Sequence, residues 1–176
     1  FNINGPGEWN NYSSTVTSVN ITAINGIATL EFKSNNQSGT IWIIGFGLGI
    51  STGYLQLTVV PGPPYQLNLR MKQNYPSVIF ADGFAETVVE SVVYDYYGNL
   101  VTGATNTVLF SLSGEGSIRS GPETVKMVSI KVVDGKADVH IRSSTKTGQI
   151  LITGESAGLI MSSTTITTQA GVAYKI

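Results

Sequence analysis

The sequence predicts an all-β protein made of antiparallel β-sandwiches in tandem, and three observations support this. Apolar and polar residues alternate with a period of two along most of the chain, most clearly in Lys136–Arg142. Two-residue turn sequences, Asn25-Gly26 and Asp134-Gly135, separate such alternating segments. The end of the chain also aligns with its beginning. No convincing amphipathic helix is present.

The internal repeat has a period of 109 residues, because Phe1–Leu67 aligns with Phe110–Ile176 without a gap. About 18 of these 67 aligned positions are identical. A repeat of this length corresponds to a whole small domain. We therefore expect residues 1–62 to be the C-terminal half of one repeat. Residues 63–171 should form a complete repeat, and residues 172–176 should begin a following one.

Seven segments of the complete repeat have the length and residue types of strands: 65–71, 87–96, 106–112, 125–133, 136–142, 149–153 and 162–168. The Asp-Gly turn favours a hairpin because a type I′ turn needs positive φ at both central residues. Seven short strands in about 105 residues are typical of an immunoglobulin-like sandwich. Its core should include Leu67, Leu69, Val88, Val92, Leu109, Val128, Ile130, Val139, Ile141, Ile150 and Ile152.

The first copy is incomplete, since residues 1–60 lack the counterparts of the segments 65–71 and 87–96. A half sandwich should expose the inner residues Ile21, Ala28, Leu30, Phe32, Ile41 and Ile43, and it should leave open strand edges. We expect the missing strands to come from the parent protein upstream of Phe1. The alternative is a strand donated by a neighbouring subunit. The prolines of residues 61–64 should make a stiff linker between repeats arranged end to end.

The motifs of the complete repeat follow a particular order. Residues 92–104 read VVYDYYGNLVTGA, residues 108–118 read VLFSLSGEGSI, and an Asp-Gly-Lys-Ala hairpin begins at Asp134. This order resembles the bacterial immunoglobulin-like repeats of the invasin/intimin type, which occur in prokaryotic cell-surface and S-layer proteins. The resemblance implies extracellular stalks or surface layers, and it implies no enzymatic activity.

Composition excludes several classes of function. The chain is 41% apolar and only 12% charged, with a net charge of −1, whereas about 25% charged residues are usual. It therefore lacks the basic stripe that nucleic-acid binding requires. It also has no apolar run long enough for membrane insertion. Without cysteine it can form neither a disulfide nor a thiolate metal site.

No set of catalytic residues is recognisable. His140 is the only histidine, and it lies on the polar side of its strand between Asp138 and Arg142. A nucleophile, a base and an orienting group are not found together, and no further metal ligands follow at short spacing. We therefore expect no enzymatic activity and no cofactor. Calcium held by Asp82 and Asp95 at one pole of the sandwich is an alternative, but Asp95 more simply caps the turn before Gly98.

Two kinds of surface site are predicted. Three Asn-x-Ser/Thr sequons make Asn11, Asn20 and Asn36 candidates for N-glycosylation, and the strand pattern turns all three outward. A candidate contact loop carries clustered apolar residues in both repeats; the alternative is that these residues fold over their own core. They are Phe46, Leu48, Ile50, Leu159, Ile160 and Met161.

These observations lead us to expect a non-enzymatic structural repeat of an exported cell-surface glycoprotein, either an S-layer or a stalk component. Its partners would be other copies of itself or neighbouring repeats. One alternative is an adhesion module that binds a receptor or glycan, with sugar stacking on Trp9, Trp42, Tyr94, Tyr96 and Tyr97. The other alternative is a spacer domain of a larger secreted enzyme.

Overall fold

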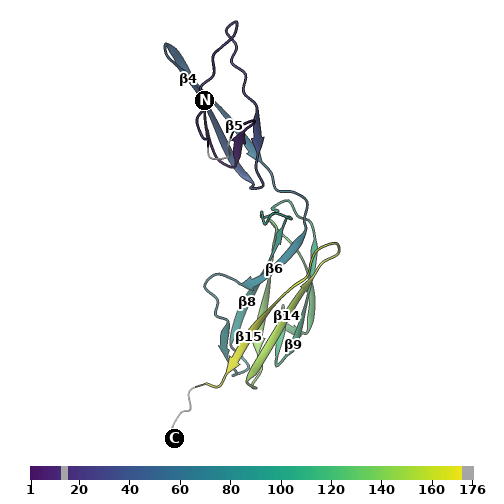
Figure 1. Cartoon of the computed structure of the whole chain (residues 1–176). Coiled ribbons are helices and arrows are strands. Elements are labelled where there is room, and N and C mark those ends of the chain that lie inside the picture. Colours follow the sequence, from purple (N-terminus) through teal and green to yellow (C-terminus); the bar gives the residue numbers. More distant parts are fainter. Residues whose placement is uncertain (13–15, 172–176) are drawn as a thin grey trace. The chain divides into compact units, whose positions relative to one another are not determined.

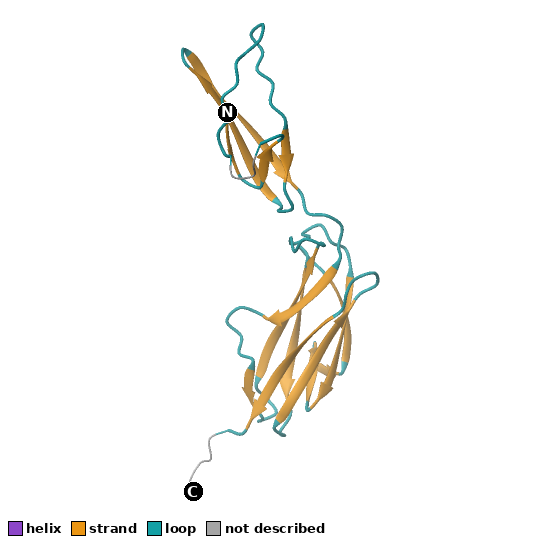
Figure 2. Ribbon diagram, in the orientation of Figure 1, coloured by secondary structure: helices purple, strands orange, loops and turns teal. Residues whose placement is uncertain are grey.

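The computed structural model describes residues 1–12 and 16–171, and these form fifteen strands and no helix (Figure 2). Within these residues, therefore, no helix could cross a membrane. The chain divides into two compact units, Phe1–Gly62 (unit 1) and Pro63–Ile176 (unit 2). The expected start of a further repeat at 172–176 lies outside the described residues.

Unit 2 consists of two five-stranded sheets. The order in the first sheet is β11 (Glu123–Val125), β10 (Gly116–Ser120), β13 (Lys136–Ser143), β8 (Glu86–Tyr94) and β6 (Gln66–Met71). The order in the second sheet is β12 (Met127–Lys131), β9 (Thr107–Gly114), β14 (Gly148–Glu155), β15 (Ser162–Gln169) and β7 (Val78–Phe80). Figure 1 shows β6 and β8 in one layer and β9, β14 and β15 in the other. Among the described residues of unit 2, every strand pair is antiparallel except β15–β7, which is parallel.

The inner faces of the two sheets enclose the core of unit 2. The alternation predicted for β13 is confirmed, because Ala137, Val139 and Ile141 are at most 5% exposed while His140 is exposed. Phe110 of β9 and Ile150 and Ile152 of β14 are fully buried in the opposite sheet. This core fixes which face of each strand is available to solvent.

The expected burial of Val88 and Val92 is confirmed, but they lie on the outer face of the sheet and not in the main core cluster between the sheets. Their cross-strand partners on β13 are His140 and Lys136, whereas Val89 pairs with the inward Val139. The run Thr87–Val93 is buried at every position, since β8 has neighbours on both sides and cover on both faces. Its sequence therefore carries almost no alternation that could reveal the inner face.

The second sheet contains a similar correction. The expectation that Leu109 lies in the core is wrong, because it is only half-buried while its neighbours Val108 and Phe110 are fully buried. Val128 and Ile130 pack against the core but remain half-buried, because β12 is an edge strand. An edge strand covers the core incompletely since it has a neighbour on one side alone.

The expected seven strands of this unit are ten among its described residues. The segment 125–133 is not one strand, because it divides at Lys126 into β11 and β12, which belong to opposite sheets. Strands β7, β10 and β11 are three to five residues long. Such lengths are too short to show a clear period of two.

Unit 1 contains a three-stranded sheet and a two-stranded sheet. The first has the order β1 (Asn2–Asn4), β4 (Gly39–Gly47) and β5 (Ile50–Val59), and the second pairs β2 (Gly7–Trp9) with β3 (Phe32–Ser34). Ile3, Trp9, Val19 and Ile41 form its buried cluster.

The strand registers of the two units match with the shift of 109 residues. Ile3 pairs with Ile43 as Leu112 pairs with Ile152, and Gly7 pairs with Ser34 as Gly116 pairs with Ser143. The turn Asn25-Gly26 has φ values of 53° and 80°, and its counterpart Asp134-Gly135 has 51° and 75°. The fold class is therefore confirmed as tandem immunoglobulin-like sandwiches, of which the first contains only its second half.

The inner residues of unit 1 are incompletely buried at most positions, as expected for a half sandwich. Ile21, Ala28, Leu30, Phe32 and Ile43 are only partly buried, while Val139, Ile141 and Ile152, the counterparts of the last three, are at most 1% exposed. Ile41 is the exception, because it is fully buried rather than exposed to water. It lies in the cluster with Ile3, Trp9 and Val19, which shields it without help from further strands.

Candidate functional site

The outer face of the first sheet of unit 2 carries a row of charged side chains across three strands. Arg70 of β6 lies opposite Glu90 of β8, and Glu90 lies opposite Asp138 of β13. Lys136 of β13 and Lys72, which follows β6, lie beside them. We call these five residues the charged strip.

Every cation of the charged strip contacts one of its two carboxylates. Arg70 donates from Nε and Nη2 to Oε2 of Glu90 at 2.9 and 2.7 Å, and Nζ of Lys136 lies 3.6 Å from Oε1. Lys72 donates from Nζ to Oδ2 of Asp138. The hydrogen bond to Glu90 raises the pKa of the Arg70 guanidinium, and the bond to Asp138 raises the pKa of the Lys72 ammonium. Each cation of the charged strip thus forms an ion pair with one of its two carboxylates.

Two carboxylates directly opposite one another could suggest acid–base chemistry. Glu90 and Asp138 have Cβ atoms about 5 Å apart by the geometry of an antiparallel pair, and general acid catalysis needs one carboxyl group to carry a proton. In the structure both carboxylates are engaged by cations, Glu90 by Arg70 and Lys136 and Asp138 by Lys72. The charged strip therefore links the three neighbouring strands β6, β8 and β13 through ion pairs.

The acidic residues that the sequence suggests as metal ligands do not come together. Among the described residues, no three His, Cys, Asp or Glu side chains are grouped so that they could hold a metal ion. Asp82 precedes β8 and Asp95 follows it, so about nine residues of extended strand, roughly 30 Å, separate them. A shared calcium site at one pole of the sandwich is therefore wrong.

Asp82 instead stabilises the turn before β8. Its Oδ1 accepts hydrogen bonds from the backbone N–H of Ala85 at 2.7 Å and of Phe84 at 2.8 Å. These bonds, together with a weaker one from the Ser143 hydroxyl, lower the pKa of the Asp82 carboxyl below its ordinary value.

This lowered pKa predicts a pH-dependent contribution to stability. A carboxyl group with a lower pKa in the folded state stabilises the fold above its unfolded pKa, and that contribution disappears as the pH falls through the folded value. We expect Asp82→Asn to lower the urea midpoint of unit 2 at pH 7 and to have a smaller effect at pH 2, where more of the Asp82 carboxyl is protonated. Far-UV circular dichroism at the two pH values measures this difference.

The exposed Glu123, at the start of the edge strand β11, provides the control. Glu123→Gln should leave the urea midpoint unchanged at pH 7. A loss of stability in Asp82→Asn that persists undiminished at pH 2 would show that the charge of Asp82 is not responsible.

A second turn presents tyrosine rings. Asp95 is 2% exposed, and its carboxylate accepts hydrogen bonds from the backbone N–H groups of Tyr97 and Asn99 at 2.9 and 2.8 Å. The Tyr96 ring packs edge-on against Tyr65 and Tyr97, with centroids 5.1 and 5.2 Å apart. The predicted cap at Asp95 is confirmed, and Tyr96 and Tyr97 are 68% and 61% exposed.

The other aromatic residues suggested for sugar stacking are differently placed. Tyr94 is half-buried on the outer face of β8. Trp9 is buried in the core of unit 1, so the suggestion that it stacks on a ligand is wrong. Trp42 is 42% exposed on β4.

The predicted contact loops differ in exposure. Phe46, Leu48 and Ile50 surround the turn between β4 and β5 and are 55%, 105% and 72% exposed. In unit 2, Ile160 and Met161 are also exposed, whereas Leu159 packs against the core. The three sequon residues Asn11, Asn20 and Asn36 are exposed, and Ser13 of the first sequon lies outside the described residues. Contact through the loops and glycosylation both remain predictions.

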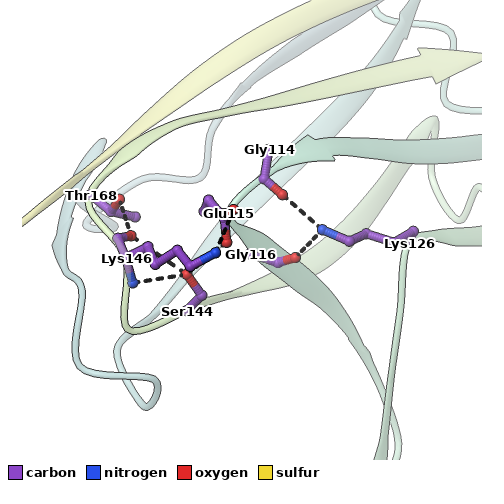
Figure 3. A network of polar contacts seen from close by, with 7 residues as sticks. All are labelled: Gly114, Glu115, Gly116, Lys126, Ser144, Lys146 and Thr168. Carbon is purple, nitrogen blue, oxygen red and sulfur yellow. Dashed lines mark hydrogen bonds and ion pairs between the residues drawn. The ribbon is translucent and has the colours of Figure 1, made fainter.

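A polar network secures the corner where the chain passes from one sheet of unit 2 to the other. Lys126 donates from Nζ to the carbonyl oxygens of Gly114 and Gly116 at 2.8 and 2.5 Å (Figure 3). Lys146 lies 3.4 Å from Glu115, and the backbone N–H of Lys146 donates to the Ser144 hydroxyl. Sequence reasoning missed this network and the charged strip, because both depend on residues that only the sheet register brings together.

Comparison with known proteins gives one family and several related structures. The family model described as "Glycoside hydrolase family 2 C-terminal domain 5" matches residues 69–165. No curated protein sequence matches the chain significantly.

Among solved structures, a glycosyl hydrolase family 2 member from Bacteroides cellulosilyticus is 21% identical over 80% of this chain, with a TM-score of 0.56. A beta-glycosidase from Bacteroides vulgatus is 17% identical over 83% of this chain, with a TM-score of 0.54. The chain spans 18% and 19% of the lengths of these two proteins. At such identities the similarity establishes the β-sandwich fold alone.

The D00-D0 domain of intimin is 15% identical over 93% of this chain and 78% of its own length. Its TM-score of 0.47 is too low to support an argument. The expected immunoglobulin-like sandwich is thus found, but the more specific assignment to invasin/intimin repeats is not supported.

Proposed function

The chain belongs to the glycoside hydrolase family 2 C-terminal domain 5 family, and on this basis we propose that it is a non-catalytic module of a larger glycoside hydrolase. The family match over residues 69–165 carries the proposal. It corresponds to the spacer-domain alternative that the sequence leaves open. None of the similar proteins named above supports the S-layer interpretation.

The proportions of the related structures support a role as one module among several. This chain spans less than a fifth of two solved glycosidases of similar fold. Such an enzyme would therefore contain most of its residues, and its catalytic machinery, outside these 176 residues. A rigid sandwich with a buried core can hold neighbouring domains at a fixed spacing without contributing to the reaction.

The chemistry of the described residues supports the same conclusion. Hydrolysis of a glycoside with two carboxyl groups needs one of them protonated and both beside a bound sugar ring. Glu90 and Asp138 are the only carboxylates that we find directly opposite one another in the described strand pairs, and both are engaged by cations. Glu90 is buried and Asp138 is half-buried on the outer face of the sheet, where they form an ion-pair network with Arg70, Lys72 and Lys136.

The proposal predicts the outcome of a substitution in the full-length protein. Replacing both carboxylates, Glu90→Gln with Asp138→Asn, should leave kcat and KM for aryl β-glycosides within about twofold of the unmodified enzyme. The isolated chain should show no turnover of these substrates. Steady-state kinetics with a panel of aryl β-glycosides measures both.

Three results would contradict the proposal. A fall in kcat of more than a hundredfold in the doubly substituted enzyme, with unchanged circular dichroism, would place catalysis in this module. Turnover by the isolated chain would do the same. A full-length protein that contains no glycosidase domain would remove the proposed role itself.

A further inference from the structure

We propose that unit 1 contains a vacant binding site for two β-strands equivalent to β6 and β8. We further propose that polypeptide N-terminal to Phe1 in the full-length protein fills this strand-binding site. This inference is independent of the enzymatic role proposed above. It depends on the comparison of the two units, residue by residue.

The first part of the strand-binding site is an apolar groove on the inner side of unit 1. Its volume is about 370 Å³, and it is lined largely by Phe1, Ile21, Ala28, Gly45, Phe46 and Ile50. Ile21 and Ala28 are among the partly buried residues whose side chains should face the core of a complete sandwich. An apolar groove of this kind is a place where another chain segment gains stability by burial.

Strand β6 occupies the corresponding space in unit 2. Gly45 corresponds to Gly154, where an added Cβ would lie 2.6 Å from Cδ1 of Leu69. Ser51, which also lines the groove, corresponds to Ile160, and the backbone of Ile160 accepts a hydrogen bond from Leu67 N–H at 2.9 Å. The groove of unit 1 is therefore the position that β6 fills in unit 2.

The second part of the strand-binding site is the free edge of β3. In unit 2, β13 is eight residues long and pairs with β8 from Lys136 to Arg142. In unit 1 the corresponding residues 27–33 have no such neighbour among the described residues, and only Phe32–Ser34 is extended as a strand. A row of unpaired backbone groups beside an apolar surface favours the addition of a strand.

Unsatisfied polarity near the same cluster agrees with a missing segment. Nε1 of Trp9 is buried and has no hydrogen-bond partner among the described residues. A buried indole N–H normally finds an acceptor. Backbone carbonyl groups of an added strand are one source of such an acceptor.

The order of the chain identifies the occupant. In unit 2 the strands β6 and β8 precede β9, and the segment from Tyr65 to Leu109 contains 45 residues. Because unit 1 repeats the same register, its equivalents of β6 and β8 should lie within about the 45 residues before Phe1. The equivalent of β6 should carry apolar residues at alternate positions, as Leu67 and Leu69 do in β6. A strand donated by a second copy is the competing arrangement.

The direct test compares this chain with the natural chain extended by about 45 residues upstream. Amide hydrogen exchange of residues 27–33 should become at least tenfold slower in the extended chain, and both chains should sediment as monomers. Unchanged exchange rates would overturn the proposal. It would also fail if the natural protein begins at Phe1, or if protection rises with protein concentration, since that indicates strand exchange between copies.

A variant on β5 tests specifically whether the upstream segment occupies the strand-binding site. Gly53 faces open space in unit 1, with no atom within 4 Å of an added Cβ. Its counterpart Ser162 contacts β6, because its Oγ accepts a hydrogen bond from Leu69 N–H at 3.0 Å. We expect Gly53→Leu to leave exchange in this chain unchanged but to abolish the added protection in the extended chain.

Thr52→Leu provides the matched control, because neighbouring residues of a strand face opposite sides of the sheet. It should change neither chain. Equal protection in the extended Gly53→Leu and Thr52→Leu variants would show that the upstream segment does not occupy the groove, and would overturn the proposal.

Discussion

Replacing Val139 with aspartate should lower the free energy of unfolding of unit 2 by about 4 kcal/mol or more, a loss that is near the upper range for single substitutions. Val139 is 1% exposed and packs within the main core cluster. An aspartate there would enter the core without a cationic partner. Urea unfolding followed by far-UV circular dichroism measures the change.

The neighbouring substitution His140→Asp provides the control. His140 is exposed on the outer face of the same strand, so its replacement should change the free energy of unfolding by about 0.5 kcal/mol or less. Similar losses in the two variants would show that the inward and outward faces of β13 are wrongly assigned.

The second large effect is expected at the corner between the two sheets. Gly114 has a φ of +101°, and a Cβ at this position would lie 2.3 Å from the carbonyl oxygen of Gln149. Alanine would therefore meet both backbone strain and a contact with main-chain atoms that cannot move freely. We expect Gly114→Ala to lower the free energy of unfolding by about 3 kcal/mol.

Gly121 separates these two causes. Its φ is +62°, but no atom lies within 4 Å of an added Cβ, so Gly121→Ala should cost only about 1 kcal/mol. The same urea experiment measures both variants. Equal and small losses would show that the corner can adjust to a side chain, and that the close approach of Gly114 to β14 is not required.

The strands that could be predicted from the sequence are those with one polar and one apolar face. The segment Lys136–Arg142 alternates clearly because its outer face meets solvent, and the prediction of its inner residues is confirmed. Strand β8 could not be oriented, since Val88 and Val92 are covered on the outer face while Val89 and Val93 form part of the core. Burial on both faces removes the alternation on which the assignment depends.

The surface sites could also be predicted only in part from the sequence. The turn at Asp95 was predictable because its hydrogen bonds join residues within four positions of each other. The charged strip was not, because Arg70 and Glu90 are 20 residues apart and Lys72 and Asp138 are 66 apart. Pairs of this kind require the sheet register, which local sequence does not contain.

The internal repeat does carry information about the pairing of residues that lie far apart in the sequence. Because two copies preserve one register, the alignment of Ile43 with Ile152 and of Gly5 with Gly114 reveals positions that a single copy would leave ambiguous. The incomplete state of unit 1 followed from this alignment. The burial of Ile41 did not, because it depends on the local cluster around Trp9.

The parallel pair between β7 and β15 has a consequence for synthesis of the protein. Val78 pairs with Thr167, which lies near the C-terminal end of the unit 2 sequence, so this contact cannot form until almost the whole unit has left the ribosome. Contacts between residues so distant in sequence close slowly, because a long loop must be ordered first. During that interval the edge of β7 is open, and we expect folding of the nascent chain to be completed by the docking of β15.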